Sequence, residues 1–136
     1  MDALPFAFDR DAALAELRRI LRPGGRAVFT AAHRLPEHPS YDAAERTWRE
    51  RIAQAGLEVE AEIERPEEPD LWERLYVILA EHEAQVRSEL SEEGAEILYD
   101  EVRNATPMVR LRTALLYTVR APFEDFYEDL EVRAAV

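Results

Sequence analysis

The chain has 136 residues, of which 47% are hydrophobic and 34% are charged, and its formal net charge is −12. This length suits one globular domain with a hydrophobic core. The excess of acidic residues repels phosphate backbones and anionic lipids, so we expect no nucleic-acid partner and no membrane partner. Cysteine is absent, which excludes disulfides, thiolate catalysis and Cys-based zinc sites.

The sequence also bears on where the protein is found. No stretch approaches the roughly 18 apolar residues that span a bilayer. The N-terminus lacks a basic region followed by an apolar one, which a secretion signal requires. We therefore expect a cytoplasmic protein.

The first predicted elements are a helix and a strand. Apolar residues recur at helical spacing over residues 10–21, with Asp9 or Asp11 as the N-cap. Pro23-Gly24-Gly25 ends this helix, because proline disfavours helix at the preceding residue and glycine readily adopts the left-handed conformation. Ala27–Ala31 is apolar on both faces, as central strands of α/β sheets are.

A second helix and a second strand follow. The sequence predicts the helix over residues 41–55, capped by Ser40 or Asp42 and ended by Gly56. Apolar residues then alternate strictly with acidic ones, which predicts a strand over residues 57–63 with one face buried. Its other face would expose four carboxylates to water, those of Glu58, Glu60, Glu62 and Glu64.

The region 66–111 changes to helical patterns. Asp70 and Glu73 have the spacing of a capping box, which predicts that a helix begins there and runs to residue 88. Another helix begins at Ser91, and a β-rich run over residues 112–121 predicts the last strand. The residues predicted to share one face of the first of these helices are Leu71, Leu75, Ile78, Leu79, His82 and Val86.

This order of helices and strands indicates an α/β fold rather than a bundle or a sandwich. We expect one domain over residues 1–121, with residues 66–111 as a helical insertion before the last strand. Residues 122–136 mix aromatic and acidic side chains and fall outside the pattern. They are predicted to form a C-terminal tail.

Two segments resemble a known family. The segment Leu14–Phe29, with its Leu-Arg-Pro-Gly-Gly turn, resembles the late helix, turn and fifth strand of small-molecule class I S-adenosylmethionine-dependent methyltransferases. Asp2–Ala7 resembles the Leu-Pro-Phe loop after the third strand of that family. Ala55-Gly56-Leu57 follows its pattern of a helix, an Ala-Gly-Phe turn and a sixth strand. The resemblance covers residues 2–121.

The resemblance implies a truncated Rossmann-like fold. The chain would keep only the C-terminal half, with a three-stranded mixed sheet in the family order 5-7-6, and would lack the fourth strand. Its four glycines form no Gly-x-Gly motif, which the family uses to hold the cofactor. We therefore expect no cofactor for the isolated chain. S-adenosylmethionine would bind only if a partner supplies the missing half.

The lost fourth strand leaves Ala27–Ala31 as an exposed edge. An apolar edge is an aggregation hazard, so we expect it to pair with a second copy across a two-fold axis, or with a chain carrying the missing half. Three functions stay open. The chain is a dimerising or partner-completing interaction protein, a repurposed cofactor-independent cyclase, isomerase or hydrolase, or a fragment of an intact methyltransferase.

The enzyme hypothesis has its own candidate residues. His33 and His38 follow the first strand, where ligands of open α/β sheets lie, and are the candidate catalytic groups. The same residues also fit solvated loop positions. A substrate pocket would be lined by Arg34, Tyr41, Trp72, Tyr76, Tyr99 and Met108, although aromatic residues also fill ordinary cores. No His-x-x-x-His or Glu-x-x-His spacing supports a metal site.

Overall fold

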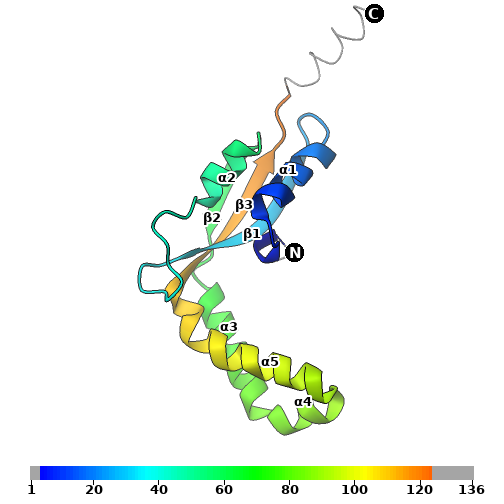
Figure 1. Ribbon diagram of the computed structural model, residues 1–136, viewed down its shortest axis with the longest axis vertical. Helices are drawn as coiled ribbons and strands as arrows, with labels where there is room; N and C mark the ends of the chain where they lie inside the picture. The colour runs from blue at the N-terminus through cyan, green and yellow to red at the C-terminus, as the bar shows by residue number, and fades with distance from the viewer. Residues whose placement is uncertain (1–3, 124–136) are drawn as a thin grey trace, which may run out of the picture. The chain divides into compact units, whose positions relative to one another are not determined.

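The computed structural model describes residues 4–123, so most of the predicted tail, residues 124–136, lies outside the described residues (Figure 1). The elements are, in chain order, η1 (Leu4–Phe6), α1 (Arg10–Ile20), β1 (Arg26–Arg34), α2 (Trp48–Gln54), β2 (Glu58–Glu64), α3 (Glu68–Glu81), α4 (Glu83–Glu89), α5 (Glu92–Ala105), η2 (Thr106–Leu111) and β3 (Arg112–Arg120).

The chain divides into two compact units. The sheet unit comprises residues 4–33, 44–64 and 115–123 of the described chain, and the helical unit comprises residues 34–43 and 65–114. None of the helices within residues 4–123 is long and apolar enough to cross a membrane.

The three strands form one sheet in the order β1-β3-β2. β2 pairs antiparallel with β3. At the two ends of the β1–β3 pair, the Ala121 N–H donates to the Gly25 carbonyl at 2.9 Å, and the Leu35 N–H donates to the Leu111 carbonyl at 2.8 Å. The α/β fold and its strand order are therefore confirmed. Both pairings are antiparallel rather than mixed, because the central strand runs opposite to both neighbours.

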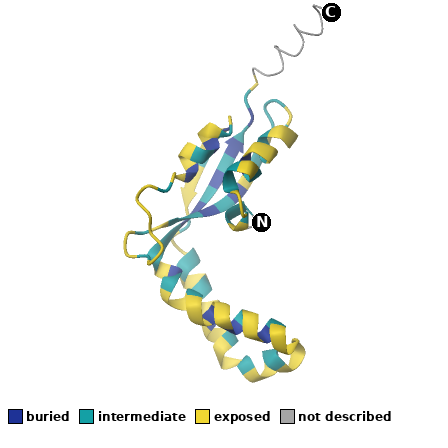
Figure 2. Ribbon diagram, viewed as in Figure 1, coloured by how far each residue is buried: buried dark blue, intermediate teal, exposed yellow. Residues whose placement is uncertain are grey.

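α1 and α2 pack on one face of the sheet, which we call the helix face. Leu14 of α1 and Ile52 of α2 are completely buried in one core with Phe29, Tyr117 and other strand residues (Figure 2). Within residues 4–123, no helix of this unit lies on the opposite face, which we call the open face. The core of the helix face consists of Leu14, Phe29, Ala31, Trp48, Ile52, Leu57, Leu115, Tyr117, Val119 and Ala121.

The caps of the first two helices differ in how well they were predicted. Asp9 caps α1 as expected, since its carboxylate accepts the Ala12 N–H at 2.9 Å. The prediction of a helix over residues 41–55 is wrong at its start. Thr47 and Glu50 form a capping box instead, so α2 begins only at Trp48. Asp42 with Glu45 and Thr47 with Glu50 have the same capping-box spacing, so the spacing alone does not choose between the two starts.

β2 departs from the predicted alternation. A β-bulge between Val59 and Ala61 inserts one extra residue, Glu60, so the faces exchange beyond it. Ile63 therefore lies opposite Leu116 and is 52% exposed, whereas Glu62 lies opposite buried Tyr117. Four freely hydrated carboxylates are not found.

The carboxylates of β2 are held by arginines instead. Glu62 pairs with Arg49 of α2 at 2.6 Å, which places it on the helix face. On the open face, Glu60 pairs with Arg26 at 2.6 Å and Glu58 pairs with Arg120 at 2.7 Å.

The helical unit differs from prediction in where its first helix begins and which face it buries. α3 begins at Glu68 and ends at Glu81, and a separate α4 follows His82. Trp72, Tyr76 and Leu79 join the core of this unit. The stripe expected to be buried is largely outward, since Leu71, Leu75 and Ile78 are 52%, 42% and 50% exposed. α5 begins as predicted, with Ser91 accepting the Gly94 N–H.

Candidate functional site

The candidate site is the free edge of β1. The hydrogen bonds at both ends of the β1–β3 pair fit one register, in which alternate residues of β1 such as Phe29 bond to β3. The backbone N–H and C=O groups of Val28, Thr30 and Ala32 then point away from β3. No described strand pairs with that side. The edge therefore offers backbone donors and acceptors to an added strand.

The side chains of this edge do not hinder the addition of another strand. From Ala27 to Ala32 no residue is charged, and Val28 is 59% exposed on the open face. Soluble proteins ordinarily protect an edge with charged residues, proline or a bulge. β2, the other edge of the same sheet, carries both acidic residues and a bulge. Strand addition is therefore chemically favoured at β1 and disfavoured at β2.

Phe29 anchors β1 to the helix face. It is 5% exposed, and its ring lies 5.7 Å from Trp48 and 5.6 Å from Tyr117, measured between ring centroids. The Trp48 indole also donates to the Ala32 carbonyl at 3.2 Å. Burial raises the pKa of Tyr117 well above its usual range, and the nearby Glu62 carboxylate adds to this. The edge strand is thus held rigidly on its inner side.

Ion pairs flank the open face at the N-terminal end of β1. Arg26 donates two hydrogen bonds, of 2.6 and 3.0 Å, to the Glu60 carboxylate across the intervening β3. The bond from Arg26 lowers the pKa of Glu60. Arg120, in the strand between them, reaches Glu58 and, at 3.3 Å, Glu60. This cluster neutralises its own charges and leaves Val28 as the nearest uncovered side chain on β1.

The predicted catalytic histidines fall in different surroundings. His33 is half-buried near the end of β1. His38 lies in the loop that follows, where its Nδ1 accepts the Ser40 N–H at 3.0 Å. Arg34 donates to the Ser40 carbonyl at 3.4 Å, and Tyr41 is 44% exposed. His38 and Tyr41 therefore lie in one short loop, which Arg34 at the end of β1 contacts through Ser40, whereas His33 lies within the strand.

The other predicted pocket residues lie among the helices. The rings of Trp72 and Tyr76 lie against each other with centroids 5.7 Å apart and planes tilted by 37°. The Tyr99 hydroxyl donates to the Leu79 carbonyl at 2.8 Å. Tyr76 is 6% exposed, and burial raises its pKa. Met108 is half-buried in η2. Trp72, Tyr76 and Tyr99 belong to the packed core of the helical unit.

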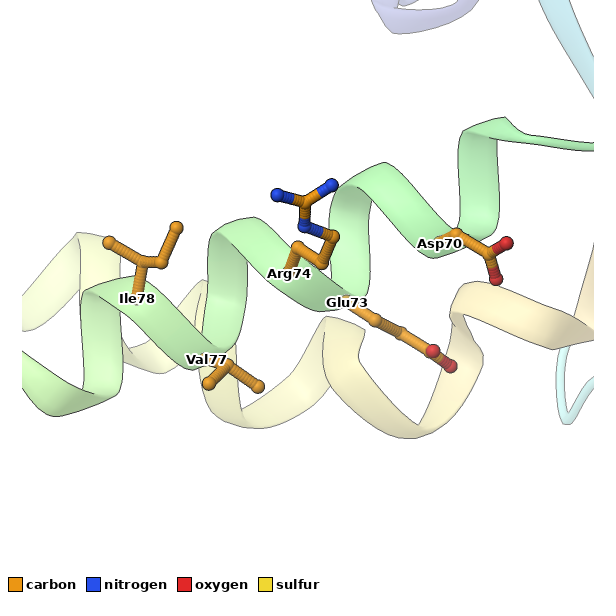
Figure 3. Close-up of a pocket in the computed structure, with 5 residues that line it drawn as sticks. All are labelled: Asp70, Glu73, Arg74, Val77 and Ile78. Atoms are coloured by element: carbon orange, nitrogen blue, oxygen red, sulfur yellow. The ribbon is translucent and has the colours of Figure 1, made fainter.

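A surface depression on α3 was not predicted from the sequence. It is lined by Asp70, Glu73, Arg74, Val77 and Ile78 (Figure 3). Arg110 binds both of its carboxylates, at 2.7 Å to Asp70 and 2.6 Å to Glu73, which raises the pKa of Arg110. Both carboxylates that line the depression are therefore paired with Arg110. Within residues 4–123 no cluster of His, Asp and Glu could hold a metal ion.

Comparisons with known proteins show which fold this chain shares with them. No family model matches the sequence, and no curated protein matches it either. The chain is similar in structure to the [4+2]-cyclase SpnF, with a TM-score of 0.68 and 18% identity, covering 90% of this chain and 47% of that one.

Two further solved structures are similar to this chain. A protein of Galdieria sulphuraria assigned as a sarcosine dimethylglycine methyltransferase gives a TM-score of 0.69 at 16% identity, with 90% and 51% of the two chains covered. A Haemonchus contortus phosphoethanolamine N-methyltransferase 2 gives 0.64 at 12% identity, with 89% and 32% covered. The chain thus has a class I methyltransferase fold and spans about half or less of the chains it resembles.

Proposed function

We propose that this chain is an interaction module with a methyltransferase fold, which lacks a methyl-donor site of its own and functions after a strand from another polypeptide has been added at β1. The observation that carries this proposal is the edge itself. The residues Ala27–Ala32 are uncharged, their outward backbone groups lack a described partner strand, and the inner side is fixed by Phe29.

The expectation about the cofactor rests on the sequence. The four glycines are Gly24, Gly25, Gly56 and Gly94, and none forms the Gly-x-Gly turn on which a Rossmann-like fold seats a cofactor. One structural neighbour is described in complex with S-adenosylhomocysteine, and this chain covers 32% of that neighbour. Binding of S-adenosylmethionine would therefore be a property of an assembly.

Calorimetry tests the cofactor part of the proposal. Titration of S-adenosylmethionine into the purified chain should give no binding heat at micromolar concentrations. Micromolar affinity of the chain alone would overturn the proposal, because the donor site would then be built from these residues.

Two occupants of the β1 edge are compatible with this function. One is a second copy of the chain, and the other is a polypeptide that carries the remaining half of the fold. Co-expression separates them, since the second occupant would co-purify in a one-to-one complex that binds S-adenosylmethionine. The hypothesis of a fragment of an intact methyltransferase predicts the same complex.

A cofactor-independent enzyme is the second candidate, because one structural neighbour is a [4+2]-cyclase. His38 supplies the specific observation within this chain. Its Nδ1 accepts a backbone N–H, so the neutral ring carries its hydrogen on Nε2 and can donate a hydrogen bond from there. The role that fits is a hydrogen-bond donor to a substrate oxygen that gains negative charge in a cyclisation, isomerisation or hydrolysis.

Substitution tests this second function. In an assay without added cofactor, His38→Ala should lower turnover by at least about 100-fold, the usual cost of removing a hydrogen-bond donor to a developing oxyanion. His33→Ala measures whether the strand histidine takes part. Full activity in both variants would exclude these two side chains as catalytic groups.

A further inference from the structure

We propose that the strand added at the β1 edge is β1 of a second copy of this chain, related by a two-fold axis that lies midway between Phe29 and the partner's Phe29. The inference rests on the proposed function, because it names the partner of the same edge. The product is one continuous six-stranded sheet, in the order β2-β3-β1-β1-β3-β2.

The geometry of the edge permits this pairing. A two-fold axis perpendicular to the sheet makes the two β1 strands antiparallel, which is the arrangement that β3 already has with each neighbour. The outward N–H and C=O groups of Val28 and Thr30 and the N–H of Ala32 then find partners on the other copy, whereas the Ala32 carbonyl already accepts from the Trp48 indole. The same operation keeps both α1 helices on the helix face of the joined sheet.

Charge selects the register. In a two-fold antiparallel pair one residue of β1 lies opposite the same residue of the partner, and the axis lies midway between the two. We name each register by that residue, so that an axis through Thr30 means one midway between the two copies of Thr30. An axis through Thr30, the midpoint of the strand, places Arg26 opposite the partner's Arg34 at both ends of the seam. Like charges directly opposite one another destabilise a sheet. This register is therefore disfavoured.

An axis through Phe29 avoids that conflict. It places Val28 opposite the partner's Thr30 and Arg26 opposite the partner's Ala32, and residues 26–32 of both copies overlap. No charged residue then faces another across the seam. Arg26 stays with Glu60 of its own sheet, at 2.6 Å.

The same register extends an existing aromatic row. Phe29 already lies beside Tyr117 and Trp48, with centroids 5.6 and 5.7 Å apart. With the axis through Phe29, the two phenylalanines become a cross-strand pair on the helix face, and aromatic pairs are among those that stabilise sheets. An axis through Ala31 would place Phe29 opposite the partner's His33 and give no such pair.

The absence of cysteine from the sequence permits a clean test. Val28→Cys and Thr30→Cys are prepared as separate full-length proteins, mixed in equal amounts and oxidised with oxidised glutathione. With the axis through Phe29, these two positions lie directly opposite, about 5 Å apart between Cβ atoms, whereas each lies farther from its own symmetry mate. We expect the mixture to form several times more disulfide-linked dimer than either variant alone.

Matched controls lie on the other edge. Ala61→Cys and Ile63→Cys of β2, treated in the same way, should stay unlinked, alone and mixed. Efficient linking of Thr30→Cys alone would place the axis at Thr30 and overturn the register. A monomeric mass of the wild-type chain in sedimentation, with no linking in any sample, would overturn the second copy as the partner. Binding of S-adenosylmethionine by the chain alone would instead overturn the proposed function.

Discussion

The two edges of the same small sheet have opposite chemistry. β2 carries Glu58, Glu60, Glu62 and Glu64 and is interrupted by a bulge, and arginines hold three of these carboxylates. β1 has no charged residue between Arg26 and His33 and no interruption of its nine residues. A bulge and charge are means by which natural sheets prevent strand addition. The β2 edge is therefore protected against strand addition, and β1 is the edge that we propose for assembly.

The largest expected difference between the two edge strands is in stability. Phe29→Ala should lower the free energy of unfolding by about 3–5 kcal/mol, because a buried aromatic side chain leaves a cavity in the core. Ile63→Ala on β2, where the side chain is 52% exposed, should change it by less than about 0.5 kcal/mol. Urea denaturation measures both.

If Phe29→Ala fails to fold, Phe29→Leu gives a milder change at the same position, of about 1.5 kcal/mol or less. Equal effects of the Phe29 and Ile63 substitutions would show that β1 is not anchored as described.

The glycines that lead into the two edges give the next difference. Gly24 and Gly56 both have positive φ, so alanine should cost about 1–2 kcal/mol at either position. A Cβ on Gly24 would also clash with the Phe123 ring, whereas a Cβ on Gly56 meets nothing closer than Arg18 at 3.9 Å. Thermal unfolding should therefore show the larger loss for Gly24→Ala.

The excess loss at Gly24 should disappear in a Phe123→Ala background, because the ring that creates the clash is gone. An excess that persists in that background would mean that Phe123 is not the neighbour responsible.

A lysine placed on each edge strand in turn should affect self-association differently. Val28→Lys should weaken self-association at least about tenfold, since a single charged residue on an edge disfavours strand addition. Ile63→Lys on β2 should leave association unchanged. Sedimentation over a range of concentrations measures both, with circular dichroism to show that each variant is folded. Equal association of the two variants would refute the assignment of β1.

The smallest expected effect is the pH dependence of the β2 edge. The Arg26 bond lowers the pKa of Glu60 in the folded state below its ordinary value. Its stabilisation is therefore present above the unfolded pKa and is lost as pH falls through the lower folded pKa. Glu60→Gln should reduce the acid-induced loss of stability between neutral pH and about pH 3.

Glu64→Gln serves as the matched control, because Glu64 makes no ion pair within residues 4–123. Urea midpoints measured across this pH range compare the two variants. The same change of slope in both would show that the Arg26–Glu60 pair is not its cause.

Periodicity and turn chemistry were enough to predict the layers of the sheet unit. The Pro-Gly-Gly turn separates α1 from β1, and the family resemblance supplied the strand order, which the structure confirms. The bulge at Glu60 could not be predicted, since the alternation through residues 57–64 is unbroken in the sequence. A bulge shows itself only when β2 pairs with β3.

The helical unit shows a second limit of sequence patterns. α3 has two overlapping apolar stripes, one through Leu71, Leu75 and Ile78 and one through Trp72, Tyr76 and Leu79. Periodicity alone cannot choose between them. Packing against α5 and η2 buried the stripe with the aromatic residues. The candidate edge was predictable because it depends on composition and strand order, whereas the depression on α3 depends on side-chain positions.

Backbone amide exchange at β1 tests the central claim most directly. If β1 is the assembly edge, the outward amides of Val28 and Thr30 should be protected at high protein concentration and lose protection on dilution or in Val28→Lys. The outward amides of Glu62 and Glu64 on β2 should exchange rapidly throughout. Rapid exchange of Val28 and Thr30 at every concentration, at the rate of the β2 amides, would contradict the account.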